Sequence, residues 1–196
     1  GEGHFTPKTT IDVGNSTTDA IRSLLLSDVG GGSVYMISPR HVVGDLRFPE
    51  YMRVGEDLWV VLRLFSKAGS IEKVISPLYY YDHSNSSSLT HSVSYPVALE
   101  WVNGFCENKA FLAENGLFDS VEREWAWSAL RFKSLFVVSP DYFDDFRNLI
   151  SEANAHISDC PLLSKKMKLL MHVVNCRLDG IAKLILSGSR LLDHAD

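Results

Sequence analysis

The strongest hydrophobic pattern of the chain follows Gly55 and ends at Gly69. Between these glycines, the apolar residues Leu58, Val61, Leu62 and Phe65 recur at helical spacing. This spacing places their side chains on one face of a helix. The pattern therefore predicts an amphipathic helix, with Glu56 and Asp57 in its first turn.

Two apolar runs, one before and one after this helix, predict strands. Residues Ser33 to Ser38 have the composition of a buried strand, and Ile71 to Tyr81 end in a cluster of tyrosines. β-branched and aromatic residues of this kind favour a pleated sheet. We expect both strands in one small sheet that packs against the helix of Leu58 to Ala68. The predicted fold class is therefore α/β, with more helix than strand.

From Pro96 to the end of the chain, the hydrophobic pattern is helical. Caps and periodicity predict four helices, at Pro96 to Asn115, at 119–137, from Ser139 to Ile157, and from near Asp159 through Ile185. Gly116 is the glycine expected directly after the first of them. The last helix carries five basic residues outside its apolar stripe, namely Lys165, Lys166, Lys168, Arg177 and Lys183. Such a helix either packs on its helical neighbours or lies on an anionic membrane surface.

Length, charge and cysteine content narrow the class of protein. The 196 residues are enough for one compact unit with its own core, and the formal net charge of −5 disfavours nucleic-acid binding. The three cysteines, Cys106, Cys160 and Cys176, are odd in number and far apart, which disfavours a disulfide framework and a metal site. The sequence has neither a transmembrane run nor a signal-peptide pattern. We expect a cytoplasmic location, with peripheral contact at the inner face of the membrane as an alternative.

Glu56 and Asp57 are the strongest candidates for catalytic residues in this sequence. The backbone N–H groups and the dipole at a helix start stabilise a negative charge by roughly 0.3–1 kcal/mol at an exposed site. An ionised aspartate within hydrogen-bond reach of an acidic group can act as a general base. The alternative is that the pair only caps the helix, which is the commoner role of acidic residues in this position.

The wider order of residues around this pair resembles a known family. Within residues 33–92, Arg47-Phe48-Pro49-Glu50 precedes Gly55-Glu56-Asp57, the predicted helix follows, and then come Pro77-Leu78-Tyr79-Tyr80-Tyr81 and Ser88-Leu89-Thr90. This order is similar to that of the acceptor-side half of family 2 glycosyltransferases of the GT-A fold. The resemblance implies an inverting transfer from a nucleotide-sugar donor to a glycan or lipid-linked saccharide acceptor. It makes Asp57 the general base and lets Glu56 orient the acceptor or its loop.

The resemblance also marks candidate acceptor-binding residues. Arg40 and His41 follow the first predicted strand, where the family borders its acceptor site, and Trp59 can stack on a sugar ring. His83 and His91 flank a loop rich in serine, downstream of the acidic pair, where a histidine closes on the metal in several GT-A enzymes. For each residue, an ordinary role in a turn, a loop or the core is the alternative.

The donor-binding half that the family requires is not recognisable in this sequence. Family members hold a divalent cation, Mg²⁺ or Mn²⁺, with an Asp-x-Asp motif upstream of Gly-Glu-Asp, and this chain contains no Asp-x-Asp. We therefore expect the C-terminal part of a longer enzyme, inactive alone, with the cation ligands outside this chain.

Three segments follow from this interpretation of the chain. Residues 1–32 are a linker or a remnant of the donor-binding half, 33–95 are the acceptor-side part of the catalytic domain, and 96–196 are a C-terminal helical region. The long helical region also fits an alternative function, that of a noncatalytic helical interaction module or a membrane-surface module.

Overall fold

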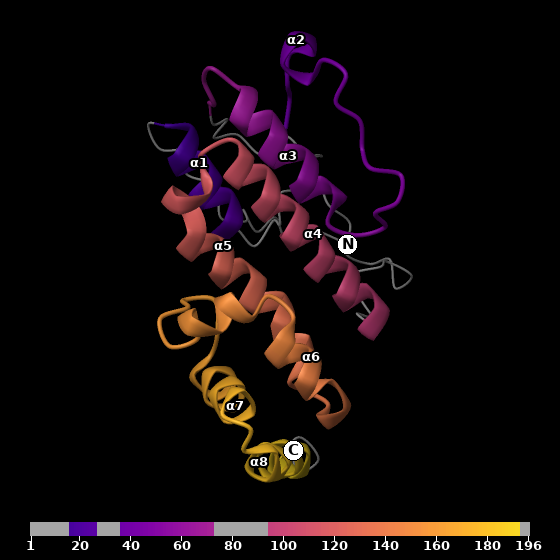
Figure 1. Cartoon of the computed structure of the whole chain (residues 1–196), viewed down its shortest axis with the longest axis vertical. Helices are drawn as coiled ribbons and strands as arrows, with labels where there is room; N and C mark the ends of the chain where they lie inside the picture. The colour runs from indigo at the N-terminus through magenta and orange to yellow at the C-terminus, as the bar shows by residue number, and fades with distance from the viewer. Residues whose placement is uncertain (1–15, 27–35, 73–93, 193–196) are drawn as a thin grey trace, which may run out of the picture. The chain divides into compact units, whose positions relative to one another are not determined.

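The computed structural model describes residues 16–26, 36–72 and 94–192, with side chains up to Gly188. Every regular element in these ranges is a helix (Figure 1). The described residues form two compact units. Unit 1 comprises those up to residue 72 together with 107–121, and unit 2 comprises 94–106 together with those from 122 onward. None of the described helices combines the length and apolar character needed to cross a membrane.

The predicted α/β fold with a small sheet is wrong, because no strand occurs in the described ranges. Of the first predicted strand, residues 36–38 have irregular backbone, and the side chain of Ile37 is 93% exposed. Of the second, Ile71 and Glu72 are irregular as well. The rest of both predicted strands, residues 33–35 and 73–81, lies outside the described residues. An apolar run alone does not distinguish a strand from extended surface chain, since a strand also needs a partner.

Unit 1 buries the predicted amphipathic helix against other helices. The helix, α3 (Glu56–Lys67), contacts α1 (Thr17–Leu26) and the short α2 (Arg40–Val43). Its buried side chains are Leu58, Val60, Val61, Leu62, Leu64 and Phe65, and those of α1 are Ala20, Ile21, Leu24 and Leu25. Full burial of one such large aliphatic side chain stabilises the fold by about 1.5–3 kcal/mol. The apolar face of α3 therefore finds helical partners in place of the predicted sheet.

Two long helices supply residues to both units. They are α4 (Tyr95–Glu114) and α5 (Phe118–Lys133), close to the predicted bounds of 96–115 and 119–137. The turn between them contains Gly116 with φ of 66°, which confirms the glycine expected after the first of these helices. In unit 2, α5 is followed by η2 (Ser134–Phe136), η3 (Pro140–Tyr142), α6 (Phe143–Asn148), η4 (Ser151–His156), α7 (Lys165–Asn175) and α8 (Asp179–Leu192).

The last two predicted helices are each broken in the structure. The helix expected from Ser139 to Ile157 is interrupted at Ile150, with φ of 46°, and the last one at Arg177, with φ of 59°. A left-handed backbone at a residue other than glycine costs free energy and ends an α-helix. The hydrophobic spacing continues through both breaks, so periodicity alone predicts two uninterrupted helices that do not form.

Side chains from other elements stabilise both breaks. The Lys133 ammonium is fully buried and donates hydrogen bonds to the carbonyl oxygen of Ile150, at 3.0 Å, and to Oδ1 of Asn154, at 2.6 Å. Arg147, whose side chain is 9% exposed, donates from Nη1 to the carbonyl oxygen of Val174, at 2.9 Å, and to Oδ1 of Asp179, at 2.8 Å. Arg147 thus connects the end of α7 with the first turn of α8.

Burial changes the protonation of Lys133. The low-polarity surroundings disfavour the charged ammonium and lower the pKa of Lys133 to about 7, with the charge of Glu152 opposing the shift. Both acceptors of Lys133 are neutral, so a neutral amine can keep donating to them. The junction at Ile150 therefore tolerates loss of this charge.

The depressed pKa of Lys133 predicts a pH-dependent stability. Between the folded pKa of about 7 and the ordinary value of 10.5, the folded protein binds fewer protons than the unfolded chain, so its stability rises with pH. The slope from one such group is at most about 1.4 kcal/mol per pH unit. Lys133→Met should remove this part of the slope, as measured by urea unfolding over a series of pH values. Lys67→Met, at an exposed lysine, is the control and should keep it. Equal slopes in both variants would contradict the buried ammonium.

Candidate functional site

The start of α3 is fixed by the backbone of Gly55. This residue has φ of 82°, a left-handed conformation that glycine adopts without steric cost, and it has no side chain to cap the helix. Glu56 and Asp57 follow in the first turn, as the sequence predicts. The Gly-Glu-Asp order therefore has a local structural reason, since glycine sets the helix start and the carboxylates occupy the end of the helix with positive dipole.

The two carboxylates lie in partly buried positions. Burial raises the pKa of Glu56, and the neighbouring charge of Asp57 raises it further, while a hydrogen bond from the backbone N–H of Glu56 opposes the change. Glu56 consequently holds a proton more readily than an exposed glutamate does. A carboxylate pair in such surroundings suits proton transfer to or from a bound molecule.

One face of α3 leads from Asp57 into a groove of about 280 Å³. Asp57, Val60 and Leu64 follow at i, i+3 and i+7 and thus share a face. The groove is lined by Met36, Ser38, Val43, Leu46, Arg47 and Phe48, together with Val60 and Leu64. Asp57 therefore lies on the same face of α3 as these two lining residues, without being one of the residues that line the groove.

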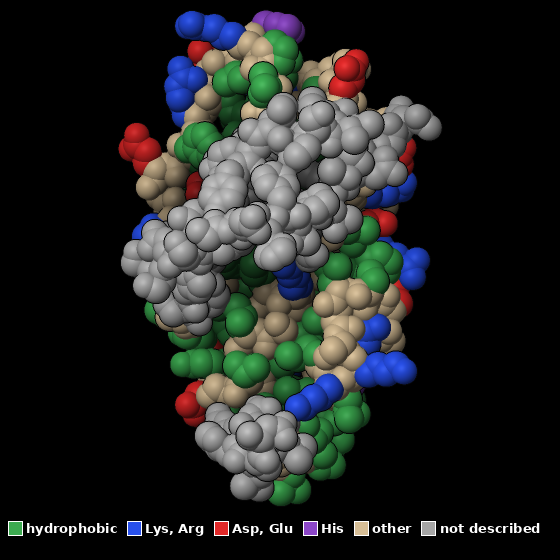
Figure 2. Space-filling view, turned by 180° about the vertical axis from the view of Figure 1, so that it is seen from behind, with side chains coloured by type: hydrophobic (Ala, Val, Ile, Leu, Met, Phe, Trp, Pro, Cys, Tyr) green, Lys and Arg blue, Asp and Glu red, His purple; other side chains and the backbone are tan. Residues whose placement is uncertain are grey.

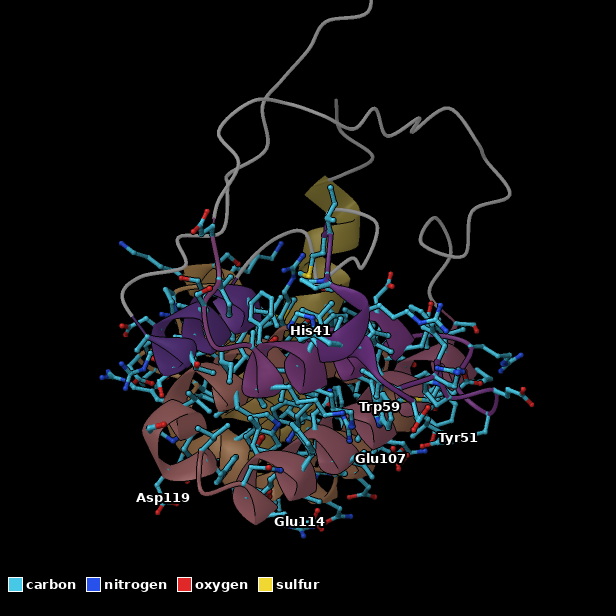
Figure 3. All side chains as sticks on the ribbon, turned by 90° about the horizontal axis from the view of Figure 1, so that it is seen from above. His41, Tyr51, Trp59, Glu107, Glu114 and Asp119 are labelled. Carbon is cyan, nitrogen blue, oxygen red and sulfur yellow. The ribbon has the colours of Figure 1, made fainter. Side chains whose placement is uncertain are left out.

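A different face of α3 contacts α4 through Glu107. Its Oε2 accepts a hydrogen bond from the indole Nε1 of Trp59, at 3.0 Å, and another from the hydroxyl of Tyr51, at 2.7 Å. Figure 3 shows these three side chains together, with His41 apart from them. A single carboxylate oxygen thereby connects the loop before α3, α3 itself and α4. The hydrogen bond to Glu107 is the main reason that the pKa of Tyr51 is raised.

Arg63 packs between two aromatic rings beside this cluster. Its guanidinium carbon lies 3.4 Å from the ring centroid of Trp59 and 4.3 Å from that of Phe111. Nη1 donates to the carbonyl oxygen of Trp59 at 2.9 Å and to Oδ1 of Asn108 at 3.2 Å. Burial lowers the pKa of Arg63 to about 10, against the opposing charge of Glu107. Arg63 covers one face of the Trp59 ring, so a sugar can stack only on the other.

The remaining predicted acceptor contacts fall into two groups. Arg40 and His41 are exposed and belong to α2, where the sequence predicts a turn after a strand. His83 and His91 lie outside the described residues. In the part of the chain that the structure describes, no group of three or more His, Cys, Asp or Glu side chains is arranged to hold a metal ion.

Sequence reasoning misses the cluster around Glu107. The contact between Trp59 and Arg63 can be predicted from the sequence, because side chains four residues apart on a helix are neighbours. Trp59 and Glu107 are 48 residues apart in the sequence, so their contact follows from tertiary packing alone. No local pattern singles out Glu107 from the other acidic residues of the chain.

Comparison of the chain with protein-family models, with curated proteins and with solved structures found no match. The candidate site therefore depends on the geometry of its own residues and on the resemblance in residue order around Gly55-Glu56-Asp57.

The charged acceptor at Glu107 predicts a measurable effect on Tyr51 and on stability. In Glu107→Gln, both donors lose a charged acceptor, which should lower the free energy of unfolding by about 1–2 kcal/mol. The pKa of Tyr51 should move down toward its ordinary value, because the hydrogen bond that raises it weakens. Urea unfolding and an ultraviolet titration of the tyrosines measure the two effects.

Glu114→Gln is the matched control for this variant, since Glu114 is exposed at the end of the same helix. It should leave both quantities nearly unchanged. An unchanged tyrosine titration in Glu107→Gln would contradict the bond between Tyr51 and Glu107.

Proposed function

We propose that this chain is the acceptor-side part of an inverting glycosyltransferase. The enzyme transfers a sugar from a nucleotide-sugar donor to a glycan or a lipid-linked saccharide. The observation that carries the proposal is the placement of Glu56 and Asp57 in the first turn of α3, directly after a left-handed glycine. The resemblance assigns the general base to the aspartate of Gly-Glu-Asp. The helix start at Gly55 places this aspartate where the helix dipole stabilises its negative charge.

The proposed reaction is a single displacement at the anomeric carbon of the donor sugar. The acceptor hydroxyl oxygen forms the new bond as the bond to the nucleoside diphosphate breaks, so the anomeric configuration inverts. Asp57 takes the hydroxyl proton, a contribution of about 10²–10⁴-fold to the rate. A divalent cation, Mg²⁺ or Mn²⁺, would offset the charge of the leaving diphosphate, with its ligands in the donor-binding half outside this chain.

The groove beside α3 is the place where the proposal puts the acceptor. Asp57 precedes the lining residues Val60 and Leu64 on the same face of α3, and Val43 of α2 also lines the groove. Because Arg40 lies three residues before Val43, the two share a side of α2, which supports Arg40 as an acceptor contact. Trp59 lies on a different face of α3 from this groove, so it would stack on a sugar ring outside the groove, through the ring face that Arg63 leaves uncovered.

Glu56 has a supporting role in this proposal. Its partly buried carboxyl, with a raised pKa, neighbours the proposed base. The Glu56 carboxyl can hydrogen-bond to an acceptor hydroxyl or to the loop before α3, next to the proposed base. Glu56 is therefore proposed to orient the acceptor, whereas Asp57 removes the proton.

Asp57→Asn tests the proposed base in a protein that joins this chain to its donor-binding half. The substitution keeps the shape of the side chain and removes the proton acceptor, so turnover should fall by about 10²–10⁴-fold. Stability should change by no more than about 1 kcal/mol, the usual size of a dipole contribution. Glu56→Gln should reduce turnover less.

Asp119→Asn is the matched control for Asp57→Asn, because Asp119 is also acidic and lies in the first turn of a helix, α5. It should leave turnover unchanged. A turnover assay and a thermal melt are run for each variant. If Asp57→Asn keeps more than about a tenth of the turnover, well above what loss of a general base allows, the acidic pair is only a cap.

A second expectation concerns the chain by itself. Isothermal titration with common nucleotide-sugars and Mn²⁺ should give no binding heat, because the proposed ligands of the diphosphate and the cation lie outside this chain. Micromolar binding would show a donor site within these 196 residues and would contradict the proposed division of the enzyme.

A further inference from the structure

Helix α8 (Asp179–Leu192) has both covered and exposed apolar side chains. Ala182 is buried, and Ile185 and Leu186 line a groove of about 250 Å³ next to α7. Next to them, the side chains of Leu178, which directly precedes α8, and of Ile181 and Leu184 are 49%, 49% and 71% exposed. These three follow each other at steps of three residues and form one exposed stripe. Exposed apolar side chains that gather in one place mark a surface that binds a partner or a membrane.

The neighbouring helix α7 repeats this arrangement on a smaller scale. Its inner side carries the buried residues Leu170, Met171 and Val174. On its outer side, Leu169 is 55% exposed. Lys165 and Lys166 precede Leu169 by four and three residues, so they flank it on the helix surface. An exposed leucine thus lies next to two exposed lysines.

Positive charge accompanies the exposed apolar side chains. Residues 165–188 contain five basic residues and one acidic residue, although the whole chain has a net charge of −5. The acidic residue, Asp179, is paired with Arg147. In the lower part of Figure 2, hydrophobic side chains gather over the C-terminal helices, with Lys and Arg side chains next to them.

We propose that the α7–α8 segment docks on an anionic membrane surface. The stripe of Leu178, Ile181 and Leu184 enters the boundary between headgroups and acyl chains, and the basic residues bind the anionic headgroups. The contact is peripheral, in keeping with the lack of a membrane-spanning helix among the described residues. This inference does not depend on the glycosyltransferase proposal.

Charge is the reason for choosing a membrane as the occupant of this surface. Two copies that met through this segment would bring like charges together, which disfavours a symmetric dimer. A neutral apolar partner would leave the lysines without a role. A surface with anionic groups above an apolar layer matches both the leucine stripe and the lysines.

Vesicle sedimentation with the full chain tests the proposal. The chain should bind vesicles of phosphatidylcholine mixed with phosphatidylglycerol, and at least tenfold more weakly vesicles of phosphatidylcholine alone. Raising the salt from about 0.1 M to about 1 M should weaken binding, because the screening length shortens from about 10 Å to about 3 Å. Since the chain as a whole is acidic, a general electrostatic effect predicts no binding to the anionic vesicles.

Two variants separate the apolar and the charged contributions. Ile181→Asp with Leu184→Asp removes part of the stripe, and Lys165→Glu with Lys166→Glu and Lys183→Glu reverses the charge. Each should reduce binding at least tenfold. The matched controls are Ile37→Asp, at a residue that is 93% exposed, and Lys67→Glu, at an exposed lysine of α3. Both controls should bind like the unaltered chain.

Several results would overturn the proposal. They are absence of binding to the anionic vesicles, equal binding to both kinds of vesicle, and equal losses in the variants and the controls. A dimer in gel filtration that the stripe variant disrupts, without vesicle binding, would make the surface a protein interface. Circular dichroism checks each fold, and if the stripe variant unfolds, the lysine variant decides the outcome.

Discussion

The left-handed backbone at Gly55 sets the rotational phase of α3, and both faces of the candidate site depend on that phase. The backbone N–H of Trp59 donates a hydrogen bond to the carbonyl oxygen of Gly55, at 3.0 Å, so the hydrogen-bonded turns of the helix begin at this glycine. Moving the start by one residue would rotate every side chain by about 100° around the axis. Asp57 would then leave the face of the groove, and Trp59 would lose its position opposite Glu107.

Partly or fully buried charges hold the junctions between helices in both units. Glu107 bonds to two donors from different parts of unit 1, and Arg63 packs between two aromatic rings close by. In unit 2, Lys133 and Arg147 donate to backbone carbonyls at or beside the places where helices end. Each group loses solvation when it is buried, and its hydrogen bonds offset that loss. Helix ends, which leave carbonyls without partners inside the helix, are where such cations are most useful.

How much the sequence can predict depends on how local the physical cause is. The start of α3 and the glycine at residue 116 follow from short-range patterns and are predicted well. The sheet is wrong, because an apolar run carries no information about a pairing strand. The breaks at Ile150 and Arg177 are missed, because side chains from elsewhere stabilise them. The acidic pair is placed correctly because its position depends on a local pattern, whereas the bonds of Glu107 to Tyr51 and Trp59 depend on tertiary packing and are not foreseen.

The division of α4 between the two units has a practical meaning for shortened forms of this protein. Its residues up to Cys106 belong to unit 2 and those from Glu107 to unit 1, so neither unit is one continuous stretch of chain. A truncation after residue 95, where the sequence suggests a boundary, would separate Tyr51 and Trp59 from Glu107. Such a fragment would keep every residue of the acidic motif and lose the carboxylate that positions the helix carrying it. In such a fragment, α3 would therefore lack a support that it has in the longer chain.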